Sequence, residues 1–103
     1  MSNSEPRITG PTLMVLGTLL QSPRDELSGA EIGRITKLAS GTLYPILLRL
    51  EEAGWLASRW EVEDPQALGR PRRRFYRVTG DGARKAKAAV RALEPALGRA
   101  AWA

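Results

Sequence analysis

The sequence predicts a mainly α-helical domain with one small β-hairpin, a fold of the α+β class. Three observations predict it. Apolar residues recur with helical spacing in the first half of the chain, a strand–turn–strand pattern follows at residues 55–79, and a further helical pattern ends the chain. The 103 residues are enough for one domain but not for two.

The first predicted helix begins near Pro11 and ends near Gln21, after a polar arm at residues 1–8 that we expect to be disordered. Its segment LMVLGTLL is apolar on almost every side, which indicates burial on more than one face. Because the domain's own core covers only one face, we expect a second copy of the chain to cover another. The residues expected at that dimer contact are Leu13, Leu16 and Leu20.

Two shorter helical segments follow, joined by a tight connection. Ser28 and Glu31 form a capping box that starts one helix, which we expect to end near Lys37. The next helix spans about residues 41–53, and Gly54 is suited to end it. Its predicted buried stripe has the spacing i, i+3, i+4, i+7 and consists of Leu43, Ile46, Leu47 and Leu50.

The hairpin and the last helix complete the chain. Strands are predicted at residues 55–63 and 72–79, with turn signals between them. The last helix, residues 81–103, is expected to begin with Asp81 as its N-cap and to be kinked or broken by Pro95. Its apolar residues follow a heptad-like spacing, which fits either dimerisation or packing on the domain's own core.

Three helices followed by a two-stranded hairpin is the order of a winged helix-turn-helix. In this interpretation, residues 9–80 form a DNA-binding domain. The helix at 41–53 would be the recognition helix in the major groove, and the hairpin at 55–79 would be the wing. The same fold also serves as a protein-interaction module, so a winged helix that mainly binds a protein partner is the alternative.

Several motifs resemble those of the PadR family of transcriptional regulators. The segment SGTLYPIL at residues 40–47, its continuation RLEEAGWL at 49–56 and the wing stretch GRPRR at 69–73 carry the resemblance, together with FYRVT at 75–79 and Gly82. The resemblance implies a homodimer, usually a repressor, that dimerises through its C-terminal helix. The two-fold symmetry of such a dimer predicts a palindromic operator. The single short C-terminal helix is similar to the compact branch of the family.

Composition excludes several other classes of function. The net charge of +5 and the pI of about 10.4 favour a nucleic-acid partner. Without cysteine or histidine, the chain lacks the usual zinc ligands, thiol nucleophiles and imidazole bases, so we expect no metal, no cofactor and no enzymatic activity. We recognise no signal peptide or membrane span, and a cytoplasmic protein is expected.

The N-terminal turns of the recognition helix supply the first group of candidate DNA contacts. Such turns meet base edges in known helix-turn-helix docking. Ser40 could instead cap the helix, Tyr44 could pack internally, and Arg49 could pair with a neighbouring glutamate. The candidates on this helix are Ser40, Thr42, Tyr44, Pro45 and Arg49. Pro45 must lie in the first turn or strain the helix slightly.

Arginines concentrated in the wing supply the second group. Strand alternation places cations on both faces of the hairpin, which favours contact with the DNA backbone or minor groove over an ordinary solvated hairpin. Arginine also suits planar contacts with phosphates or bases better than lysine does. These candidates are Arg70, Arg72, Arg73, Arg74 and Arg77.

The last helix supplies the remaining candidates for dimerisation, which are Val90, Leu93, Leu97 and Trp102. In some relatives that the PadR resemblance brings in, flat aromatic ligands lie between tryptophans at the dimer interface. A small aromatic ligand near Trp102 is therefore one interpretation, and a simple hydrophobic anchor for the dimer is the other.

Overall fold

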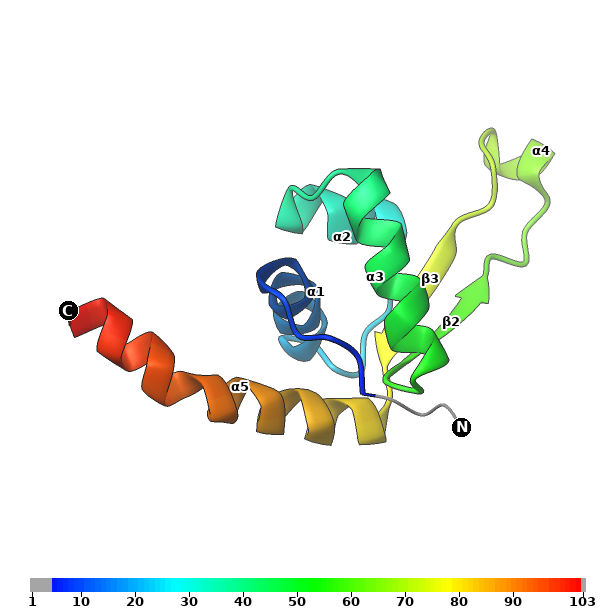
Figure 1. Ribbon diagram of the computed structural model, residues 1–103. Helices are drawn as coiled ribbons and strands as arrows, with labels where there is room; N and C mark the ends of the chain where they lie inside the picture. Colours follow the sequence, from blue (N-terminus) through cyan, green and yellow to red (C-terminus); the bar gives the residue numbers. More distant parts are fainter. Residues whose placement is uncertain (1–4, 103) are drawn as a thin grey trace.

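The computed structural model describes the backbone of residues 5–102 and the side chains of residues 5–92. The elements follow the predicted order, with a short strand and a short helix added. They are α1 (Gly10–Leu20), β1 (Leu27–Ser28), α2 (Gly29–Thr36), α3 (Ser40–Glu52), β2 (Leu56–Trp60), α4 (Pro65–Leu68), β3 (Arg74–Val78) and α5 (Gly80–Trp102). Figure 1 shows α1, α2 and α3 gathered beside the sheet, with the hairpin and α5 projecting from this body.

The sheet has three antiparallel strands in the order β1-β3-β2. Leu56 pairs with Val78 at the base of the β2–β3 hairpin, and Trp60 pairs with Arg74 toward its tip. The β2–β3 hairpin is the one expected from the sequence, whereas β1 was not expected, because a two-residue strand has no alternation to detect. The described architecture confirms the winged helix-turn-helix, mainly helical with a small sheet.

The core lies where α1, α2, α3 and α5 meet the base of the hairpin. The predicted stripe of α3 is confirmed, since Leu43, Ile46, Leu47 and Leu50 are all at most 5% exposed. Other elements contribute further buried side chains, among them Leu16, Ile32, Trp55, Tyr76 and Ala86. Ile8, which we placed in the N-terminal arm, is half-buried against this core, whereas residues 1–4 of the arm lie outside the described residues.

Two helix ends follow their predicted chemistry. The Ser28 hydroxyl accepts from the Glu31 N–H at 3.1 Å, and a carboxylate oxygen of Glu31 accepts from the Ser28 N–H at 2.9 Å. The Ser28 N–H also lowers the pKa of Glu31. After α3, Gly54 adopts a φ of 82°, and the Trp55 N–H donates to the Leu50 carbonyl at 2.9 Å, which closes the helix as a Schellman motif.

The start of α5 differs from the prediction, because Thr79 rather than Asp81 caps it. The Thr79 hydroxyl accepts from the Gly82 N–H at 2.8 Å, while Asp81 lies inside the first turn and pairs with Lys85 at 3.2 Å. A kink or a break was expected at Pro95. The break is wrong, since α5 continues through this residue to Trp102. The ribbon of α5 curves over its second half instead (Figure 1).

Candidate nucleic-acid interface

The exposed side of α3 lies opposite its buried stripe. Gly41, Thr42, Leu48, Arg49 and Glu52 are exposed, and Pro45 is half-buried among them. Pro45 is the sixth residue of the helix, beyond its first turn. Because proline has no N–H, the Gly41 carbonyl lacks its usual intrahelical donor, which is the slight strain that the sequence analysis allowed.

The N-terminus of α3 has no side-chain cap. Ala39 is the N-cap residue, and Ser40 is the first helical residue, so Ser40 does not cap the helix. The Thr42 and Leu43 N–H groups both donate to the Ala39 carbonyl at 2.9 Å. The exposed Ser40 and Gly41 precede them, at the end of the helix where the dipole favours an anion.

Tyr44 combines an internal contact with an exposed edge. Its ring lies over Gly29, where an added Cβ would come within 2.8 Å of the hydroxyl oxygen. The side chain is nevertheless 45% exposed. The two interpretations of Tyr44 are therefore compatible: it fixes α3 against the start of α2 and still presents surface beside Thr42 and Pro45.

Glu61 holds the tip of the wing in a defined conformation. Its carboxylate accepts two hydrogen bonds from the Arg70 guanidinium, at 2.7 and 3.0 Å, and a third from the Arg73 N–H at 2.8 Å. The Arg70 guanidinium, with the Arg73 N–H beside it, lowers the pKa of Glu61 to about 2. Arg70 is therefore engaged within the wing.

A second contact ties the wing to α3. Arg74 donates to the Ser58 hydroxyl at 2.9 Å and to the Glu51 carboxylate at 3.4 Å, and Ser58 donates to the same Glu51 oxygen at 2.6 Å. The Arg74 guanidinium also lies 5.2 Å from the centre of the Trp60 ring. These contacts fix the direction of the hairpin relative to the recognition helix.

Three of the candidate wing arginines, Arg72, Arg73 and Arg77, are exposed. Arg72 donates to a backbone oxygen, that of Glu63, at 2.9 Å, and this neutral acceptor does not neutralise its charge. Sequence reasoning did not single out Arg59, which makes two hydrogen bonds from Nε and one from a terminal nitrogen to Glu26. Arg59 lies over the ring of Phe75 because the two residues pair across β2 and β3. This register cannot be predicted from the sequence alone.

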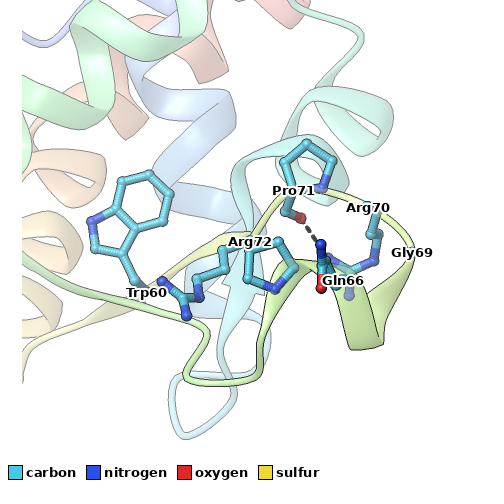
Figure 2. Close-up of a pocket in the computed structure, with 7 residues that line it drawn as sticks. Trp60, Gln66, Gly69, Arg70, Pro71 and Arg72 are labelled. Carbon is cyan, nitrogen blue, oxygen red and sulfur yellow. Dashed lines mark hydrogen bonds between the residues drawn. The ribbon is translucent and has the colours of Figure 1, made fainter.

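An open hollow of about 920 Å³ lies at the wing tip, lined by the end of β2, by α4 and by the segment between α4 and β3. Figure 2 shows Trp60 on one side of it, Arg72 in the middle, and Pro71 with Arg70 and Gly69 on the other. Its lining is mainly apolar and includes Arg70 and Arg72. The hollow therefore gives the wing an amphipathic surface, and its residues come from the segment that carries the exposed cations.

The candidate dimer residues divide into three groups. Leu13, Leu20 and Val90 are half-buried and keep surface that a partner could cover. Leu16 is fully buried in the core of the single chain, so it has no surface to offer. The side chains of Leu93, Leu97 and Trp102 lie outside the described residues.

The transcriptional regulator PadR-like family matches residues 25–88, more than half of the chain. The chain belongs to the PadR-like family. The family's members are transcriptional regulators rather than enzymes, so the predicted absence of enzymatic activity agrees with the match. The match covers α2, α3, the whole wing and the start of α5, the segments that carry the resemblance in the sequence. Comparison with curated protein sequences gives no significant match.

Solved structures similar to this PadR-like chain include known DNA complexes. AbfR of Staphylococcus epidermidis is 28% identical with a TM-score of 0.62, and the match covers 79% of this chain and 50% of AbfR. Bacillus subtilis PadR in complex with operator DNA is 21% identical with a TM-score of 0.62, covering 77% and 46%. Staphylococcus aureus MepR in its DNA complex is 19% identical with a TM-score of 0.66, covering 85% and 66%.

These likenesses support the fold, and the chain spans about half to two thirds of the structures it matches. Among the helices of residues 5–102, none has both the length and the apolar character that a membrane span requires.

Proposed function

We propose that this PadR-like chain is a sequence-specific DNA-binding repressor that binds a palindromic operator as a homodimer in the cytoplasm. The observation that carries the proposal is the pairing of an exposed, uncapped start of α3 with an arginine-rich wing held in a fixed direction beside it. In helix-turn-helix proteins the N-terminal residues of the recognition helix contact base edges, and basic wings supply phosphate contacts.

The DNA contacts divide between the two elements. Ser40, Thr42 and Tyr44, with Pro45 beside them, form the part of α3 that would enter the major groove, and Arg49 would reach a phosphate or a base edge. Arg72, Arg73 and Arg77 are the exposed wing cations that would neutralise phosphates. Arg70 and Arg74, already engaged with Glu61 and Glu51, would mainly position the wing.

The proposed dimer would form along α1 and α5. In Figure 1, α5 passes beside α1 and continues beyond the body of the domain. Met14 is 46% exposed on α1, next to the half-buried Leu13. A second copy covering these residues, Leu20 and the α5 residues Val90, Leu93, Leu97 and Trp102 would extend a small core that benefits from oligomerisation.

A small aromatic ligand at that interface, beside Trp102, would be an optional effector of the dimer. Its test is direct: flat aromatic compounds should quench tryptophan fluorescence in the intact protein and not in a Trp102→Ala variant.

Light scattering, followed by titration with random and selected duplex DNA at two salt concentrations, tests the proposal. We expect a dimer that binds selected palindromes at least 10³-fold more tightly than random DNA. An Arg72→Ala, Arg73→Ala double variant should lose affinity for both kinds of duplex, and Thr42→Ala should reduce mainly the preference. A dimer without DNA affinity at low salt would refute the proposal and favour a protein partner.

A further inference from the structure

The outward stripe of α3 is poor in groups that can form hydrogen bonds with bases. Residues 41, 45, 48 and 52 succeed one another along its centre, and the first three are Gly41, Pro45 and Leu48. None of these three side chains carries a donor or an acceptor. Leu48 is 57% exposed. The buried stripe of the helix is complete without it, so this leucine contributes apolar surface to the outside of the helix.

Apart from Glu52, polar side chains lie on the flanks of this stripe. Thr42 and Arg49 are on one flank and Tyr44 is on the other, whereas Glu52 follows at the far end of the helix. Arginine, asparagine and glutamine are the usual readers of guanine and adenine, and the helix holds one arginine and neither amide. The centre of the stripe therefore needs another way to distinguish base pairs.

The major groove offers one apolar mark, the C5-methyl group of thymine. An apolar side chain over this methyl group removes both from water, with no polar atom left unpaired. The same side chain over a cytosine amino group or a guanine carbonyl would deprive that group of its hydrogen bond to water. An apolar stripe thus both favours thymine and disfavours the other base edges.

We propose that Leu48, with Pro45 beside it, forms a thymine-methyl-reading surface at the centre of α3. This inference rests on the proposed function, because it requires α3 to lie in the major groove. Gly41 supports it, since an added Cβ at Gly41 would meet no atom of the described residues within 4 Å, and without one the helix backbone comes closer to the bases. Leu48 then sets specificity, whereas the wing sets affinity.

Replacement of thymine by deoxyuridine tests the inference, since it removes the methyl group and leaves base pairing unchanged. The duplex that selection yields is titrated with each thymine of one half-site replaced in turn. We expect at least one replacement to weaken binding of the natural protein roughly fourfold, the value of one buried methyl group. In a Leu48→Ala variant, the same replacement should have little further effect.

Ile35→Ala is the matched control, because Ile35 is 52% exposed on α2 and lies outside the stripe. This variant should keep the sensitivity to deoxyuridine. Both variants change exposed residues, so circular dichroism should show the natural fold for each. If the protein binds the selected duplex but no replacement weakens binding, or if Leu48→Ala keeps the sensitivity, the inference fails and the proposed function stands. If no duplex is preferred over random DNA, both fail.

Discussion

Gly82 lies where the first turn of α5 meets the backbone at Trp55, and this contact leaves no room for a side chain. Its Cα lies against the backbone of Trp55, and an added Cβ would clash with the Trp55 carbonyl oxygen and lie 2.6 Å from its Cα. Backbone cannot yield as a flexible side chain can. The first turn of α5 can therefore lie against the end of α3 only if residue 82 is glycine.

We expect Gly82→Ala to lower the free energy of unfolding by about 1–3 kcal/mol, the range for overpacking at a closely packed site. Thermal and urea denaturation measure this. Gly41→Ala is the matched control, because an added Cβ at Gly41 meets nothing within 4 Å. It should stabilise the protein by about 0.5–1 kcal/mol, since alanine is the better helix former. Equal effects of the two substitutions would contradict the argument.

Glu61 is the second residue whose surroundings predict a measurable property. The guanidinium of Arg70 and the N–H of Arg73 stabilise its charged form and lower its pKa to about 2. A carboxyl group whose pKa is lowered by folding stabilises the folded state above its unfolded pKa. That contribution is lost as the pH falls toward the folded value. The contacts of Glu61 with Arg70 and Arg73, which we call the clasp, should therefore persist through the mildly acidic range.

The Arg73 amide resonance reports on this clasp, because its N–H donates to the Glu61 carboxylate. Over the acidic range in which circular dichroism shows an intact fold, we expect the resonance to shift only as the pH approaches about 2. In a Glu61→Gln variant it should not titrate at all. A midpoint near the ordinary glutamate value of about 4.3 would show that Glu61 is not held by these donors.

At the scale of the elements, the wing and α3 act as one unit through Glu51. Its carboxylate accepts from both Ser58 and Arg74. The neighbouring Glu52 is exposed at the end of the same helix. The two glutamates carry the same charge, and DNA repels both. They differ in that Glu51 also holds the hairpin in its direction.

This difference predicts opposite effects on DNA affinity. Glu52→Ala removes only repulsion, so it should tighten binding by roughly twofold at moderate salt. Glu51→Ala removes repulsion but also releases the wing, and we expect a loss of roughly three- to tenfold, as for coupling of about 1 kcal/mol between neighbours. Fluorescence anisotropy with one duplex measures both. Tighter binding by both variants would show that the wing needs no such tether.

The same contacts show what could be predicted from the sequence. The buried stripe of α3 could be predicted, because its period repeats within 13 residues of one helix. The pairing of Arg74 with Glu51 could not, since the two are 23 positions apart and meet only through the register of β2 and β3. The sequence thus identified an arginine-rich wing, but not which of its arginines remain exposed.

Two nearby residues can each cap α5, which explains why Asp81 was predicted as the N-cap in place of Thr79. Thr79 and Asp81 are both good N-cap residues, and the choice depends on where the helix begins. Thr79 is also the residue whose N–H donates to the Trp55 carbonyl at 2.9 Å and whose hydroxyl lies 2.8 Å from the Gly54 carbonyl. These contacts with the end of α3 are tertiary, so a reading of residues 79–82 alone could not weigh them.

At the scale of the whole molecule, the charges that remain exposed determine how the proposed dimer responds to salt. Each subunit presents Arg49 on α3 and Arg72, Arg73 and Arg77 on the wing. If each of these four neutralises one phosphate, a dimer neutralises about eight. Release of the condensed counterions then gives a slope of log K against log salt near −7, at about −0.9 per phosphate.

Arg77 tests this count, because it is exposed on β3, where it pairs with Ala57 across the hairpin. Arg77→Ala removes two contacts per dimer, so the slope should fall to about −5 while the preference for the selected duplex is retained. Arg70→Ala is the contrast. Because Arg70 is bound to Glu61, its loss should disturb the wing and reduce affinity, and Glu61→Gln should reproduce that effect. An unchanged slope in Arg77→Ala would mean that this face of the wing lies away from the DNA backbone, and the phosphate contacts would then have to come from Arg49 on α3 and from Arg72 on the opposite face of the wing.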